Sequence, residues 1–203
     1  MHPSLKSAAL GGQENGTPDR TWLAGSLLIA TPTMSDPRFK KSVIFMCAHD
    51  AAGAMGIVIN HELPDVPLSL LLTQLAVKPS ENFADFPVLQ GGPVETARGL
   101  LLHTDDFCKS DSIRIDNRFV VTGTIEALRE MVVGEGPADK LFALGYAGWG
   151  PEQLEGELAQ DAWLVVDADP ELVFRTPANQ KWEKALKKLG VDPAFLAASA
   201  GRA

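Results

Sequence analysis

The sequence predicts an α+β protein in which helices surround a mixed β-sheet. Three short apolar runs near the N-terminus, each bounded by Gly, Pro, Asn or Asp, are typical of buried strands. Further along the chain, other segments repeat apolar residues at the spacing of amphipathic helices. These two periodicities predict both strands and helices.

The three N-terminal runs cover residues 26–30, 42–47 and 56–60. They show little alternation of apolar and polar residues, so we expect strands that are covered on both faces. The link over residues 31–39 contains two prolines, which predict a rigid loop. Small residues at 51–56 permit a tight turn or a close backbone approach.

The middle of the chain predicts a short helix over residues 68–75, followed by strands over 88–90 and 98–103. Residues 112–116 alternate apolar and polar side chains. This pattern predicts a half-exposed strand near an edge of the sheet, continued by residues 119–121.

The clearest helical spacing follows. Apolar residues at i, i+3 and i+7 predict an amphipathic helix over 125–132, with Thr124 as its N-cap and Gly134 beyond its end. A glycine-rich turn over 148–150 leads to Pro151, which favours the start of another helix. The remaining predicted elements are strands 140–146 and 163–167 and helices 151–158 and 181–189.

Composition limits the possible classes of protein. The chain has 203 residues, of which 45% are apolar and 22% charged, as in ordinary globular proteins. Its apolar runs fall far short of the roughly 18 residues that indicate a membrane span, so we expect no membrane association. We expect residues 1–20 to form a flexible tail and residues 21–203 to form a single domain.

The cysteine content indicates the cellular compartment, and the net charge limits the kinds of binding partner. The only cysteines, Cys47 and Cys108, are too few for a disulfide framework, and we expect a reducing, cytoplasmic environment. A formal net charge of −8 opposes non-specific binding to DNA. The one basic cluster has the pattern of a solvated helix face; it consists of Lys181, Lys184, Lys187 and Lys188.

Recognisable catalytic motifs are absent from the sequence, which has no phosphate-binding loop, nucleophile elbow or zinc-protease motif. Residues 145–150 could be an anion-binding turn before a helix, although a structural turn explains them as well. His49 and His103 follow apolar strands and could pair with a cysteine or bind a metal, but metal sites need three or four converging ligands. We therefore expect no metal and no cofactor, and we assign no catalytic residue.

A candidate ligand-binding cleft is indicated by polar residues at loop starts and strand ends. These residues are Asp36, Arg38, Asn60, Gln90 and His103. The alternative is that they support the scaffold, with Asp36 capping a turn, Arg38 pairing with an acid and Asn60 adopting a left-handed conformation.

Several ordered motifs resemble the YqgE/AlgH family of bacterial proteins. They are the segments 30–39, 53–60, 90–94 and 144–150, and the resemblance extends over roughly residues 23–203. It implies a branched or bifurcated sheet surrounded by helices. The chain departs from the family pattern at His61-Glu62, where a basic residue and proline are usual, and at its end, Gly201-Arg202-Ala203, where Gly-His-Ala is common.

The resemblance also implies a regulatory role, because some members are labelled putative transcriptional regulators. Our leading hypothesis is a non-enzymatic cytoplasmic protein that binds a small ligand or a protein partner in a regulatory capacity. Direct DNA binding is not expected. The alternative is a small-molecule enzyme, a hydrolase or transferase, with His49 or His103 as its base.

Overall fold

The structure, a computed structural model, describes residues 22–81, 83–123 and 125–191. Within these residues, strands join into a nine-stranded sheet with the order β6-β7-β5-β8-β3-β2-β1-β9, and β4 lies beside β8 off this path. The strands are β1 (Ser26–Ala30), β2 (Val43–Asp50), β3 (Gly53–Val58), β4 (Val88–Gln90), β5 (Val94–His103), β6 (Ile113–Arg114), β7 (Val120–Thr122), β8 (Lys140–Trp149) and β9 (Trp163–Asp167).

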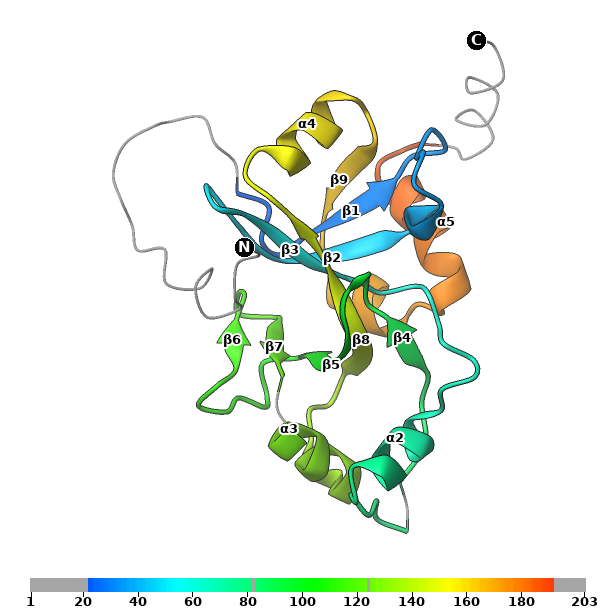
Figure 1. Ribbon diagram of the computed structural model, residues 1–203, viewed down its shortest axis with the longest axis vertical. Helices are drawn as coiled ribbons and strands as arrows, with labels where there is room; N and C mark the ends of the chain where they lie inside the picture. Colours follow the sequence, from blue (N-terminus) through cyan, green and yellow to red (C-terminus); the bar gives the residue numbers. More distant parts are fainter. Residues whose placement is uncertain (1–21, 82, 124, 192–203) are drawn as a thin grey trace.

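Helices surround this sheet in Figure 1. The described residues include the α-helices α2 (Leu68–Gln74), α3 (Ile125–Glu130), α4 (Gln153–Ala159) and α5 (Ala178–Lys188). Shorter helical turns are η1 (Pro37–Phe39), η2 (Met131–Glu135) and η3 (Glu171–Arg175). In the described part of the chain, no helix is long and apolar enough to cross a membrane.

The sheet branches along β8, which confirms the predicted bifurcated architecture. The first half of β8 lies between β5, which is antiparallel to it, and β4, which is parallel. Its second half pairs with β3 instead. Figure 1 shows the result: α2 and α3 lie at one end of the molecule, and α4 and α5 lie near the other branch.

A glycine permits the close backbone approach at this branch. Gly92 has a φ of +151°, and a Cβ atom added there would lie 2.1 Å from the carbonyl carbon of Tyr146. Only glycine avoids this overlap, because any other residue would push a carbon atom into the backbone of β8.

The burial of the strands agrees with the sequence pattern. Most residues of β1 and every residue of β3 are buried, as continuous apolar runs predict for strands covered on both faces. The half-exposed segment 112–116 contains β6, which lies at the sheet edge as predicted. Three apolar clusters fill the interior: one under α5 and η3, one under α4, and one between α2, α3 and the β4–β5–β8 branch.

Several boundaries differ from the prediction, most notably those of β3 and β8. β3 begins at Gly53 rather than at residue 56, because Asp50 Oδ1 accepts a hydrogen bond of 2.7 Å from Ala52 N and closes the hairpin turn earlier. β8 continues to Trp149, so Gly148 belongs to the strand and not to a turn. Pairing of Trp149 with Ala54 on β3 accounts for this extension. The predicted N-cap, Thr124, and the tail over residues 1–20 lie outside the described residues.

The prediction that the lysines of α5 form a solvated helix face is wrong for Lys181. Lys181 is only 2% exposed, and its Nζ donates hydrogen bonds to the carbonyl oxygens of Ile59 at 3.0 Å and Val173 at 2.6 Å. Lys188 forms an ion pair with Asp169. The face is therefore not uniformly solvated.

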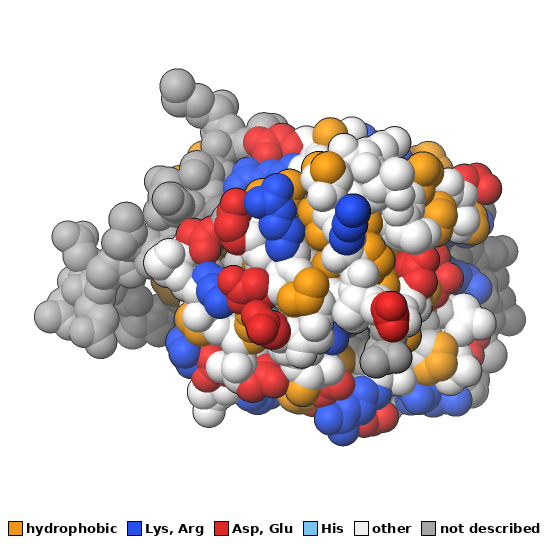
Figure 2. Space-filling model, turned by 90° about the horizontal axis from the view of Figure 1, so that it is seen from below, with side chains coloured by type: hydrophobic (Ala, Val, Ile, Leu, Met, Phe, Trp, Pro, Cys, Tyr) orange, Lys and Arg blue, Asp and Glu red, His pale blue; other side chains and the backbone are white. Residues whose placement is uncertain are grey.

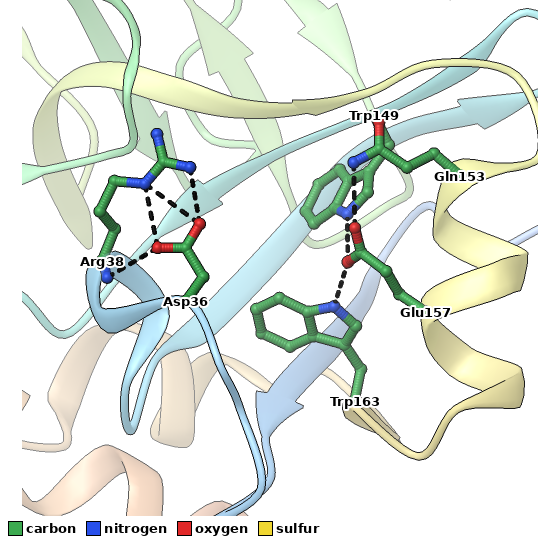
Figure 3. A network of polar contacts seen from close by, with 6 residues as sticks. All are labelled: Asp36, Arg38, Trp149, Gln153, Glu157 and Trp163. Carbon is green, nitrogen blue, oxygen red and sulfur yellow. Dashed lines mark hydrogen bonds and ion pairs between the residues drawn. The ribbon is translucent and has the colours of Figure 1, made fainter.

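A single carboxylate fixes α4 on the sheet (Figure 3). Glu157 Oε2 accepts hydrogen bonds from Trp149 Nε1 at 2.9 Å and from Trp163 Nε1 at 2.7 Å. Its other oxygen accepts one from Gln153 Nε2 at 3.0 Å. One side chain thus joins α4 to both β8 and β9 and provides an acceptor for both indole N–H groups.

Candidate functional site

Asp36 and Arg38 form a closed pair at the start of η1 (Figure 3). Asp36 Oδ1 accepts from the backbone N of Arg38 at 3.0 Å, and the guanidinium donates to both carboxylate oxygens. The hydrogen bonds from Arg38 lower the pKa of Asp36. Because the Arg38 side chain is 62% exposed and already paired, its charge is largely neutralised and contributes little as an anion site.

Asn60 and Gln90 lie near this pair, but Asn60 is hydrogen-bonded within the scaffold whereas Gln90 is exposed. Asn60 Oδ1 accepts from Val43 N at 2.7 Å, and its Nδ2 donates to Lys41 O at 2.8 Å, so this side chain ties β2 to the end of β3. Gln90 is exposed at the end of β4. Together with Arg38 and His61 it lines a depression of about 20 Å³, which has room for about one water molecule.

His103 lies elsewhere, at the far end of β5 and opposite Lys140 of β8. It is fully buried. The structure thus brings Asp36, Arg38 and Gln90 to one region, uses Asn60 within the scaffold beside it, and separates His103 from all four.

The other reactive side chains named from the sequence are also dispersed. The side chain of His49 is only 4% exposed, with its Nδ1 3.3 Å from Leu23 N and its Nε2 3.4 Å from a carboxylate oxygen of Glu155. Burial raises the pKa of the Cys47 thiol well above its ordinary value, whereas Cys108 is exposed. Among the described residues, no group of three or more His, Cys, Asp or Glu side chains could hold a metal ion.

A much larger cavity, of about 490 Å³, lies between α2, α3 and the sheet strands β5 and β8. Figure 2 views the molecule from this end, where apolar side chains gather between charged ones. The cavity is lined by Leu71, Gln74, Leu75, Ala97, Gly99, Gly123, Ile125, Leu128, Phe142 and Leu144. Cavities of this volume are typical of small-molecule sites.

Local sequence explains the shape of this cavity. Leu68 and Leu72 anchor α2 on the sheet, and this leaves Leu71 and Leu75 on the side of the helix that lines the cavity. On the sheet, a Cβ atom added at Gly99 would lie 2.8 Å from the ring of Phe142. The absence of a side chain at Gly99 therefore leaves room for the Phe142 ring against β5.

Polar side chains are scarce in the described part of the lining. Among the described residues that line it, the only polar side chain is the amide of Gln74, and none is ionisable. A charged ligand would lose its hydration there without gaining a partner. The cavity therefore suits an uncharged, mainly apolar molecule that makes about one hydrogen bond to Gln74.

Sequence reasoning missed this cavity, although one signal pointed to it. The segment 68–75 has leucines on nearly every face and no charged residue. A surface helix normally has a polar outer face. Leu70 and Leu75 are instead 45% and 41% exposed, which is typical of helices that meet a ligand or a partner.

Comparisons with known proteins agree with this fold. The family model described as AlgH-like (DUF179) matches residues 27–194. A UPF0301 protein of Rhodospirillum rubrum is 46% identical over 182 residues, which cover 90% of this chain and 95% of the relative. One from Ruegeria pomeroyi is 48% identical over 183 residues, covering 89% and 99%.

Solved structures show the same architecture. The solution structure of the AlgH protein from Pseudomonas aeruginosa matches with a TM-score of 0.75 and 35% identity, covering 94% of this chain and 100% of that one. A crystal structure of a Corynebacterium diphtheriae protein, 20% identical, shares the fold with a TM-score of 0.69 over 91% of this chain and 94% of its own. This chain belongs to the AlgH-like family of UPF0301 proteins.

Proposed function

We propose that this protein is a non-enzymatic regulatory protein whose cavity between α2 and α3 binds an uncharged, mainly apolar small molecule. The observation that supports this proposal is the lining of a cavity of about 490 Å³, in which Gln74 is the only polar side chain among the residues that the structure describes. General acid or base catalysis needs an ionisable group within reach of the substrate. A cavity lined without one is suited to binding.

The proposal places this activity in the cytoplasm and without direct contact to nucleic acid. Both Cys47 and Cys108 are free thiols, as expected in a reducing compartment. The net charge of −8 repels phosphate backbones. Of the four clustered lysines, Lys181 is buried and Lys188 is paired with Asp169, so the basic face is smaller than the sequence alone indicates.

The test is a fluorescence titration with N-phenylnaphthylamine, a neutral apolar dye with one N–H donor. We expect saturable binding to the wild type. Leu71→Glu places a carboxylate against the bound dye and is expected to weaken binding by about tenfold or more, which corresponds to about 1.4 kcal/mol. The matched control is Leu70→Glu, on the same helix but outside the cavity lining, which is expected to bind like the wild type.

A third variant, Gln74→Ala, tests the single polar contact. The loss of one neutral hydrogen bond of about 1 kcal/mol corresponds to an increase in Kd of roughly fivefold. Circular dichroism confirms that each variant is folded. Absence of saturable dye binding, or equal binding by Leu71→Glu and Leu70→Glu, would overturn the proposal.

A second candidate is a small-molecule hydrolase or transferase at the depression near η1. One arrangement favours it: His61, Arg38 and Gln90 meet there around space for one water, and His61 Nε2 is 3.4 Å from Ser42 Oγ. Burial lowers the pKa of His61, so a neutral ring capable of accepting a proton is favoured at neutral pH. His49 and His103, the bases expected from the sequence, do not line this depression.

This alternative is tested with a panel of ester and phosphate substrates. Turnover that is lost in both His61→Gln and Arg38→Met, and kept in His49→Gln, would support an enzyme at the depression. Turnover that survives His61→Gln would remove this site from consideration.

A further inference from the structure

Another cavity, smaller than the one between α2 and α3, lies between the link from β3 to α2 and the segment that leads into β4. Its volume is about 320 Å³, which is within the range of small-molecule sites. Its lining differs in kind from that of the larger cavity, because it combines apolar side chains with the carboxylates of Glu62 and Asp85. Such a lining suits a ligand with both an apolar part and a charge.

Backbone hydrogen bonds tie the two walls of this cavity together. Leu63 N donates to Val88 O, and Gln90 N donates to His61 O, each at 2.8 Å. In Figure 1 the link from β3 accordingly runs alongside β4. The lining also contains residues whose φ is fixed, on both walls: Pro64, Pro67 and Pro87. Walls that are held in this way do not have to be ordered when a ligand binds, which favours binding.

The apolar part of the lining is continuous with the core. Leu63 and Phe86 pack against the apolar cluster between α2, α3 and the β4–β5–β8 branch, and Val88 is a buried member of that cluster. The ring of Phe86 also meets the ring of Phe83 edge-on, with 6.1 Å between the ring centroids. These side chains offer no hydrogen bond, so they suit the apolar body of a ligand rather than its polar group.

The charge of this cavity is negative and is not neutralised by the chain. Asp85 Oδ1 accepts a hydrogen bond of 3.0 Å from Phe86 N, which is an uncharged donor. In the described part of the chain, neither Glu62 nor Asp85 has an ion-pair partner, and no Lys, Arg or His lines the cavity. The buried cation that interacts with Glu62, Lys181, donates to two backbone carbonyl oxygens instead. A cation from outside the chain would therefore meet both carboxylates unpaired.

We propose that this cavity binds a small organic cation, a protonated amine that carries a short apolar body. The carboxylates of Glu62 and Asp85 attract the ammonium, which has hydrogen-bond donors and no acceptor. The apolar body lies against Leu63, Phe86 and Val88, and the aromatic ring adds attraction for the cation. An anion of the same shape is repelled by both carboxylates. A different cavity carries this inference, so it does not depend on the proposed function.

The test compares hexylammonium with its uncharged and anionic counterparts, hexanol and hexanoate. Binding is followed by two-dimensional NMR through the backbone amides of Leu63, Val66, Phe86 and Val88, which line this cavity and not the larger one. We expect hexylammonium to shift these amides saturably. Its Kd should be at least about tenfold lower than that of hexanoate, because each exposed carboxylate attracts the cation and repels the anion.

A double variant tests the two charges directly. Glu62→Gln combined with Asp85→Asn keeps the size of both side chains and should raise the Kd for hexylammonium by at least about fivefold. The matched control is Asp65→Asn, in the same link but outside the lining, which should keep a Kd close to that of the wild type. Raising NaCl from about 0.05 to about 0.5 M should weaken the binding of hexylammonium and not that of hexanol, because salt screens exposed charges.

Equal Kd values for hexylammonium and hexanoate, or for hexylammonium in the wild type and the double variant, would overturn the proposal. Absence of saturable shifts at these amides up to about 0.1 M hexylammonium would do the same, because it leaves less than about 1.4 kcal/mol of binding free energy. The comparison of the three probes uses the wild type alone and remains decisive if the double variant does not fold. The dye titration with Leu71→Glu concerns the larger cavity, so its failure would leave this result unchanged.

Discussion

Replacing Lys181 by methionine should remove a large part of the increase in stability that the protein gains at alkaline pH. The Lys181 ammonium is 2% exposed and donates to two backbone carbonyls. Its burial lowers the pKa from 10.5 to about 8, an effect that the negative charge of Glu62 opposes. At 1.36 kcal/mol per pKa unit, the full difference between the two protonation states is about 3 kcal/mol.

The sign follows from proton binding in the two states. Between about pH 8 and pH 10.5 the unfolded chain keeps the proton on this lysine and the folded chain has lost it. Stability therefore rises with pH across this window, by about 3 kcal/mol in total from this group. Below pH 8 both states are protonated, and the penalty for burying the charge is constant. Lys181→Met lacks the titration altogether.

Urea unfolding followed by tryptophan fluorescence, at several pH values from about 7.5 to about 10.5, measures this contribution. The free energy of wild type minus that of Lys181→Met should increase by about 3 kcal/mol over the series. Other groups titrate equally in both proteins and cancel in the difference. Lys184→Met replaces an exposed lysine of the same helix, and its free energy of unfolding should change with pH in parallel with that of the wild type. If the free energies of unfolding of Lys181→Met and wild type changed in parallel with pH, this reasoning would be refuted.

Two further predictions concern Glu157 and Gly92, which hold α4 and the sheet branch in place. Glu157→Leu leaves the buried indole N–H groups of Trp149 and Trp163 without an acceptor and should lower the free energy of unfolding by about 2 to 5 kcal/mol. Glu157→Gln keeps one carbonyl oxygen as an acceptor and should lower it clearly less. Equal losses of the two variants in urea unfolding would contradict this prediction. Gly92→Ala forces a Cβ atom to 2.1 Å from the β8 backbone and should destabilise by more than about 3 kcal/mol. Its control, Gly156→Ala, sits in α4 with no atom within 4 Å of the new Cβ and should stabilise by about 0.5 to 1 kcal/mol.

The elements predicted best from sequence are those whose signal is local. The strand over residues 26–30 has the predicted bounds, because an apolar run between turn residues determines both its type and its length. β3 begins three residues before its predicted start, because Gly53, Ala54 and Met55 have the composition of a turn. What makes them a strand is pairing with β8, far along the chain, and no local pattern reports that partner.

Lys181 shows the same limit for a single side chain. A lysine in an amphipathic helix is normally placed in solvent, where its charge is hydrated. Its actual partners are carbonyl oxygens at the end of β3 and in η3, two elements that meet α5 only in the folded protein. The predicted cleft residues likewise omit His61, which lines the depression with Arg38 and Gln90 only once β3 and β4 are folded together.

The two branches of the sheet are closed in different ways, and this contrast explains why a binding cavity lies where it does. Around β1–β3, polar contacts lock the helices: α5 donates from Trp182 Nε1 to Ala30 O at 2.8 Å, and α4 is held by Glu157. At the β4–β5–β8 branch, α2 and α3 rest on the sheet mainly through an apolar cluster that leaves about 490 Å³ between them. Apolar contacts are non-directional, so a helix held by them can shift and leave a cavity beneath it. A helix held by a hydrogen bond from a buried indole is fixed in one position, because that bond depends on distance and angle. The directional contacts at that end come instead from the loop over residues 104–112, where Lys109 forms an ion pair with Glu130 and Asp106 accepts from Ala138 N.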